Sequence, residues 1–207
     1  AWVSLVDGQI DHFVSITPKA MDKFRQAHDL ACEAGDGDLQ ALALAWMATL
    51  NFNASRMPAM AAQLREALQL ATQQNHAAKA RLGLVLADAH RFAGDDSRSQ
   101  LWYQFAREHA IAEGDTSMMS ALLHNISAMR AGRIGLDDCF DRGDMEAAHR
   151  ALLEAESTAN YDWGAGASAL KTMVPLQARA QLLVVLGRWD EAVDRKSTRL
   201  NSSHRCI

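Results

Sequence analysis

The sequence predicts an all-α fold, an α-solenoid of about four stacked helix–turn–helix hairpins, and three observations predict it. The 207 residues include 38 alanines but only 3 prolines and 12 glycines, which favours helices over a β-sandwich or a disordered chain. The chain repeats itself with a period near 39 residues. Within each period, apolar residues recur at the i, i+3, i+4, i+7 spacing of a helix that buries one face.

The period becomes visible when the chain is shifted by 39 residues along itself. Alanines then meet alanines in the pairs Ala41/Ala80, Ala48/Ala87, Ala54/Ala93, Ala67/Ala106 and Ala71/Ala110. Turn-forming residues recur at 35–38, 74–75, 114–115 and 161–162. The third interval is longer, and we expect its surplus to form a long turn over residues 132–143. The predicted repeats span residues 1–36, 37–74, 75–114, 115–161 and 162–193, in one domain over residues 1–193.

The expected helices come in pairs, and the second helix of each pair carries one apolar stripe. The four stripes are Ala20, Phe24, Ala27, Ala31 and Ala34; Met60, Leu64, Ala67, Leu68 and Ala71; Trp102, Phe105, Ala106, His109 and Ala110; and Ala148, Ala151, Leu152, Ala155 and Ala159. First helices, such as residues 41–50 and 82–89, are apolar nearly all round, as expected between two neighbours. Since one hairpin cannot bury both its faces, consecutive hairpins are expected to stack.

Helix starts and stops follow from glycine and proline. Gly94-Asp95 and Gly187-Arg188 are expected to end one helix and begin the next, and Pro58 lies near a helix start. Pro175 stands inside the otherwise helical stretch 168–186. Because a proline within a helix costs roughly 3 kcal/mol, it predicts either a kink or a later helix start.

Both ends of the chain look unlike natural termini. It opens with Ala1 rather than methionine, and residues 194–204 match, over eleven consecutive positions, a translated short-read sequencing adapter. We therefore expect residues 194–207 to be a non-native tail and the natural chain to continue beyond both ends. Residues 1–193 are the part from which we infer function.

Charge and composition exclude several classes of function. The formal net charge is −4, and residues 1–193 carry 17 basic and 24 acidic residues, a net of −7, which disfavours direct binding to nucleic acid. No uninterrupted apolar run approaches the roughly 20 residues that a membrane span needs, and no signal peptide is visible. Cys32 and Cys139 lie far apart without a Cys-x-x-Cys pair, so we expect no disulfide and a cytoplasmic, reducing location.

Motifs for catalysis or metal binding are incomplete. Glu108-His109 lacks the second histidine of a zinc protease helix. The glycine-rich stretch 164–169 follows no strand, as a nucleotide loop would, and the loop that begins at Asp36 has Met47 where a calcium loop needs glutamate. We predict no catalytic residue, metal ligand or cofactor, and we expect Cys139 to be a loop or half-buried cysteine. His28 and His109 are expected to pack beside the stripes, and His76 and His149 to face water.

Polar positions on the first helices are the candidate binding residues, because these helices line the concave face of a solenoid. Asn51, His90 and Arg130 align through shifts of 39 and 40, with Arg91 and Asn125 beside them. The alternative is that all five are ordinary solvated positions. Trp46, Trp102 and Tyr103 fit either the core or a groove. The long turn 132–143 fits either a partner contact or a neutral insertion.

The stretch 186–192, Leu-Gly-Arg-Trp-Asp-Glu-Ala, resembles the turn of a tetratricopeptide repeat, and the resemblance extends over about residues 15–193. The period exceeds the usual 34 of that family and is similar to repeat regions of bacterial signalling proteins, such as diguanylate cyclases and transcriptional regulators. The resemblance implies a module that binds a protein, a peptide or a small effector, as the sensory or regulatory part of a longer protein. The alternatives are a stand-alone scaffold for protein assembly and an enzyme.

Overall fold

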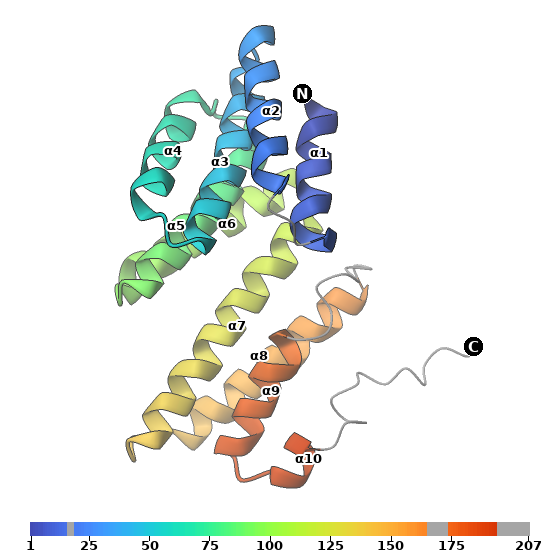
Figure 1. Ribbon diagram of the computed structural model, residues 1–207. Coiled ribbons are helices and arrows are strands. Elements are labelled where there is room, and N and C mark those ends of the chain that lie inside the picture. The colour runs from blue at the N-terminus through green and yellow to red at the C-terminus, as the bar shows by residue number, and fades with distance from the viewer. Residues whose placement is uncertain (16–18, 165–173, 194–207) are drawn as a thin grey trace, which may run out of the picture. The chain divides into compact units, whose positions relative to one another are not determined.

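The computed structural model describes residues 1–15, 19–164 and 174–193, and every element within these ranges is helical, with no strand among them (Figure 1). This confirms the predicted all-α class. The elements are α1 (Trp2–Ile10), the π-helical turn η1 (Asp11–Ser15), α2 (Lys19–Ala34), α3 (Gly37–Asn53), α4 (Met57–Leu70), α5 (His76–Phe92), α6 (Asp96–Glu113), α7 (Thr116–Cys139), α8 (Met145–Gly164), α9 (Val174–Val185) and α10 (Trp189–Val193).

The 39-residue period reappears in the positions of the helices. Helices α3 and α5 each have 17 residues, and the start and the end of α5 both lie 39 positions after those of α3. Their N-caps, Asp36 and Asn75, keep the same shift, and so do their C-caps, Ala54 and Ala93. Helix α6 likewise begins 39 positions after α4. The first helices of these two hairpins thus share both boundaries, and the second helices share the position of their start.

A glycine followed by an aspartate forms three of the turns. Gly35, Gly94 and Gly114 have φ of +67°, +78° and +70°, a left-handed conformation that costs glycine little. The aspartate that follows each glycine then accepts a backbone N–H three residues ahead, from Leu39, Arg98 or Met118, at 3.0, 3.1 and 2.9 Å. One residue therefore ends a helix and the next begins another, which keeps the connections short.

The prolines lie where a helix tolerates them. Pro58 is the second residue of α4, as expected for a helix start. As described, helix α9 begins at Val174, so Pro175 falls in its first turn. Helix α8 in turn continues to Gly164, through the turn expected at 161–162.

The described helices group into two units, residues 1–119 and 120 onward, with the boundary inside α7. In the first unit, α1 packs with α2, α2 with α3, α3 with α4 and α5, and α5 with α6. Its core combines bulky side chains with alanines at the positions that the repeat matches. Ala41, Ala48, Ala67, Ala80, Ala87, Ala106 and Ala110 are all buried, whereas the matched Ala54 and Ala93 are exposed and Ala71 is half-buried. Small side chains at these positions allow the helices to approach closely, as the sequence predicts.

The second unit also contains the long turn whose prediction is wrong. We expected a long turn over residues 132–143, but α7 continues through Gly132 and Gly135 to Cys139, and only residues 140–144 connect it to α8. Ile134 explains the extra helical turns, because it packs against the core of this unit. That core consists of Ala131, Ala151, Leu152, Ala155, Ala178, Leu182 and Leu183. Burial of Ile134 favours the helix although glycine disfavours it.

The remaining sequence predictions concern the tail, the glycine-rich stretch, Cys139 and membrane crossing. The predicted adapter-derived tail, 194–207, and residues 165–169 of the glycine-rich stretch lie outside the described residues. Cys139, expected to be a loop or half-buried cysteine, is the last residue of α7 and is exposed. Within the described ranges, none of the helices combines the length and the apolar character that crossing a membrane requires.

Candidate functional site

The five candidate binding residues divide between the two units. Asn51, His90 and Arg91 lie in the first unit, on α3 and α5, whereas Asn125 and Arg130 lie on α7 in the second. Asn51 is buried and donates a hydrogen bond from Nδ2 to Gln63 Oε1 at 2.8 Å. This bond joins α3 to α4, so Asn51 has a structural partner within its own hairpin.

His90 and Arg91 lie at the carboxyl end of α5, beside acidic groups. His90 Nδ1 is 3.8 Å from Asp95 Oδ2, and Arg91 Nη2 is 3.7 Å from Asp88 Oδ1. Asp88 also accepts a hydrogen bond from the Tyr103 hydroxyl. Burial and the neighbouring Asp88 raise the pKa of Tyr103, which therefore stays protonated and donates. These contacts tie α5 to α6 and place Tyr103 in the core, one of its two predicted locations.

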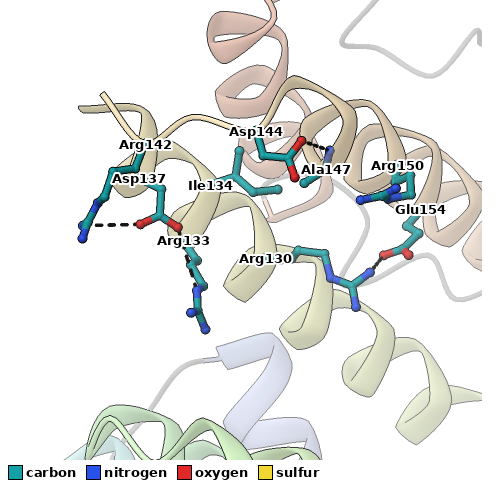
Figure 2. A pocket seen from close by; sticks show the side chains of 9 residues that line it. All are labelled: Arg130, Arg133, Ile134, Asp137, Arg142, Asp144, Ala147, Arg150 and Glu154. Carbon is teal, nitrogen blue, oxygen red and sulfur yellow. Dashed lines mark hydrogen bonds and ion pairs between the residues drawn. The ribbon is translucent and has the colours of Figure 1, made fainter. Parts of the chain in front are cut away.

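A charged pocket lies between α7 and α8, entirely within the second unit (Figure 2). Its cavity volume is about 480 Å³, within the range of roughly 300–1,000 Å³ typical of ligand pockets. The lining residues are Arg130, Arg133, Ile134, Asp137, Arg142, Asp144, Ala147, Arg150 and Glu154. Of the five predicted binding residues, Arg130 is the one that lines it. Asn125 is half-buried and lies five residues earlier on α7.

The charged side chains gather at two ends of the pocket. At one end, Asp137 lies 4.0 Å from Arg133 Nε and 3.5 Å from Arg142 Nη2 (Figure 2). At the other, Arg130 forms an ion pair and hydrogen bond with Glu154. The half-buried side chains of Ile134 and Ala147 lie between the two ends. Asp144 lies beside these two side chains, so charged groups line the pocket along its length and the apolar part is limited to Ile134 and Ala147.

Asp144 has a different role from the other carboxylates in the lining. Its Oδ1 accepts the backbone N–H groups of Glu146 and Ala147, at 2.9 and 3.0 Å, and so caps the N-terminus of α8. Its negative charge is engaged by the helix rather than by an arginine. The ion pairs of the lining are largely exposed, and each such pair contributes only about 0–1 kcal/mol to stability.

In the first unit, the charged side chain of Arg81 is buried. Arg81 on α5 is only 9% exposed, and its guanidinium carbon lies 3.7 Å from the centre of the Trp46 ring. Its Nε has no hydrogen-bond partner within the described part of the chain. Burial lowers the pKa of Arg81 to about 10, although Asp115 opposes the shift. The contact with Trp46 is a cation–π interaction, which compensates part of the cost of burying the charge.

His76 and His109 correct one sequence expectation. His109 packs beside the stripe as predicted, with its ring 4.5 Å from that of Phe105. His76 is not turned to water as expected, since its Nδ1 lies 2.8 Å from Nδ1 of His109. One of the two nitrogens must donate and the other accept, so this contact requires that at least one ring be neutral. Burial, Lys79 and His76 lower the pKa of His109 accordingly.

This histidine pair predicts a loss of stability at mildly acidic pH. The unfolded chain protonates His109 near pH 6.5, whereas the folded chain does so only at lower pH. Stability is therefore complete above about pH 6.5 and falls as the pH decreases toward the lower folded pKa. In urea titrations at pH 7.5 and 5.5, His109→Gln should show a smaller pH-dependent loss than the parent, while exposed His149→Gln should match the parent. Equal losses in the His109 variant and the parent would contradict this role.

Chemically, the pocket offers guanidinium donors, carboxylate acceptors and an apolar surface, which suits non-covalent recognition. Within the described ranges, no group of three or more His, Cys, Asp or Glu side chains could hold a metal ion. Sequence reasoning found Arg130 but missed the rest of the lining. A partial signal was present, because Arg150 and Glu154 stand four residues apart on the helix that the fourth stripe identifies, whereas Arg133 and Asp137 lie in the segment predicted to be a turn.

Fold and pocket together define an all-helical protein whose neighbouring helices pack in pairs and whose second unit carries a charged pocket. Neither family models, curated proteins nor solved structures yield a match to this chain.

Proposed function

We propose that this chain is a tetratricopeptide-like repeat module that binds a protein or peptide, and that it serves as the sensory or regulatory part of a larger bacterial signalling protein. The observation that carries the binding role is the pocket between α7 and α8, which places charged donors and acceptors around an apolar surface. The matched boundaries of α3 and α5 support the repeat character. The signalling role rests on the resemblance of the 186–192 turn and of the long period.

A protein or peptide suits the surroundings of the pocket better than a small ion does. Leu136, Phe140 and Met145 flank the lining residues in the sequence, and all three are at least half exposed. The guanidinium of Arg142 lies 5.4 Å from the ring centre of Phe140. Arginine and aromatic side chains are enriched in protein interfaces relative to the rest of the surface.

A peptide-display selection against the full chain tests the proposal. We expect enriched peptides to bind Arg133→Glu/Arg142→Glu about tenfold more weakly, because the double variant reverses two charges of the pocket. The matched control is Arg107→Glu, which makes the same charge change at an exposed position of α6 and should bind as the parent does. Failure to enrich any peptide, or full binding by the pocket variant, would contradict the proposed function.

A further inference from the structure

We propose that the first unit binds a small organic acid, whose single carboxylate is received by the buried guanidinium of Arg81 beside Trp46 and His12. All three residues belong to the first unit, whereas the pocket between α7 and α8 belongs to the second. The inference therefore adds a second site, with its own class of ligand, to the proposed function.

Arginine is an exception at this position of the repeat. A shift of 39 residues aligns Arg81 with Leu42, and a second shift aligns it with Val3, so the other two repeats have an apolar residue there. Leu42 is buried in the core of the first unit. A charged side chain at a position that the repeat gives to the core breaks the local pattern, and such exceptions are expected at functional sites.

The guanidinium of Arg81 is buried without a partner for its hydrogen-bond donors. The side chain is 9% exposed, and its Nε has no hydrogen-bond partner. Among the described residues, the guanidinium also forms no ion pair. The Trp46 ring covers one face of the group but leaves the N–H donors, which point outward in its plane, unpaired. Buried polar groups in native proteins are normally paired, and a carboxylate matches the guanidinium fork with two hydrogen bonds.

The electrostatics of the site fit a single negative charge. The pKa of about 10 keeps Arg81 charged at neutral pH. Burial and the neighbouring Arg81 lower the pKa of His12, so His12 is neutral at pH 7 and offers a hydrogen bond without adding charge. The negative charge of Asp115 acts on Arg81, but its Oδ1 accepts the backbone N–H of Met118 at 2.9 Å, at the start of α7. A ligand with two negative charges would be repelled by Asp115, which favours a monocarboxylate over phosphate.

Aromatic rings beside the guanidinium provide a surface for the apolar part of the acid. The ring centres of His12 and Phe13 lie 5.9 and 5.6 Å from that of Trp46. Trp46 is buried, whereas His12 is half-buried and Phe13 is 44% exposed, so η1 is the side from which a ligand can approach. An aromatic or aliphatic acid can thus pack against Phe13 while its carboxylate faces Arg81.

Isothermal titration calorimetry on the full chain at pH 7.5 tests this inference with three probes, benzoate, its neutral analogue benzamide, and inorganic phosphate. We expect benzoate to bind about tenfold more tightly than benzamide, and more tightly than phosphate. Arg81→Met keeps the length of the side chain without its charge and should remove the preference for benzoate. Arg107→Met, at an exposed position of α6, is the matched control and should keep it. Circular dichroism verifies that the variants retain the parent's helix content.

A second variant separates a binding role of Arg81 from a structural one. Arg81→Lys keeps the positive charge but lacks the planar fork, so it should bind benzoate several-fold more weakly than the parent. Benzoate binding that equals that of the parent in either Arg81 variant would overturn the inference. So would equal affinity of the parent for benzoate and benzamide, or the absence of binding by both. Tighter binding of phosphate than of benzoate would contradict the single carboxylate.

Discussion

Ala106→Glu is expected to unfold the hairpin of α5 and α6, with a cost of more than about 4 kcal/mol. Ala106 is fully buried on α6. A β-carbon added to Gly83 on α5 would lie only 2.9 Å from the β-carbon of Ala106. The two helices therefore approach too closely there to admit a carboxylate. A charge forced between them would be buried without a partner, and a domain's total stability is only about 5–15 kcal/mol.

Circular dichroism melts and hydrogen exchange at α5 and α6 measure this effect. Ala112→Glu is the matched control, because it introduces the same side chain on an exposed position of the same helix. The control should remain within about 0.5 kcal/mol of the parent. If Ala106→Glu melts as the parent does, then Ala106 does not face Gly83 and the register of α6 against α5 is wrong.

The repeat could be predicted from sequence because its determinants are local. The caps Asp36 and Asn75 act within three residues of themselves, and the glycine turns need only a left-handed residue. The alanine period also indicates which face of each helix is buried. Such features depend on the chain's neighbours in sequence, so the boundaries of α3 and α5 follow without knowledge of the tertiary contacts.

The extension of α7 could not be predicted in the same way. Gly132 and Gly135 lower the helix propensity of the segment and favour the turn that the sequence suggests. What favours the helix is the packing of Ile134 against the core of the second unit, which no local pattern shows. The pocket also depends on tertiary contacts, since its lining comes from two helices whose pairing brings Arg130 to Glu154.

The candidate binding residues show that aligning repeats by their period does not predict which contacts a residue makes. A shift of 39 places Asn51 and His90 at equivalent positions of α3 and α5, but it does not give their partners. The structure pairs Asn51 with Gln63 and places His90 beside Asp95. As binding residues both stay predictions, and Arg130, which lines the pocket, is the member of the set that the proposed function uses.

Trp46→Ala is expected to cost about 3–5 kcal/mol, the range for removing a buried tryptophan. Trp46 on α3 is 3% exposed and stacks on Phe24 of α2, with ring centres 5.4 Å apart. The edge of Phe13 in η1 packs against it at 5.6 Å, and the Arg81 guanidinium of α5 lies over its face. One side chain thus connects four elements, and its loss leaves a cavity beside a buried charge.

Urea denaturation of the variants separates the loss of stability caused by the cavity from the loss caused by the buried charge. Trp2→Ala, at a position 58% exposed, is the matched control and should change stability by no more than about 0.5 kcal/mol. Arg81→Met keeps the length of the side chain without its charge and should be tolerated, because apolar replacements of buried charges are often neutral. The Trp46→Ala/Arg81→Met double variant should then lose less stability than the two single losses combined, since the guanidinium no longer lacks its ring. Strict additivity would show that the ring does not stabilise the charge, and a loss below about 1 kcal/mol for Trp46→Ala would show that Trp46 does not organise this core.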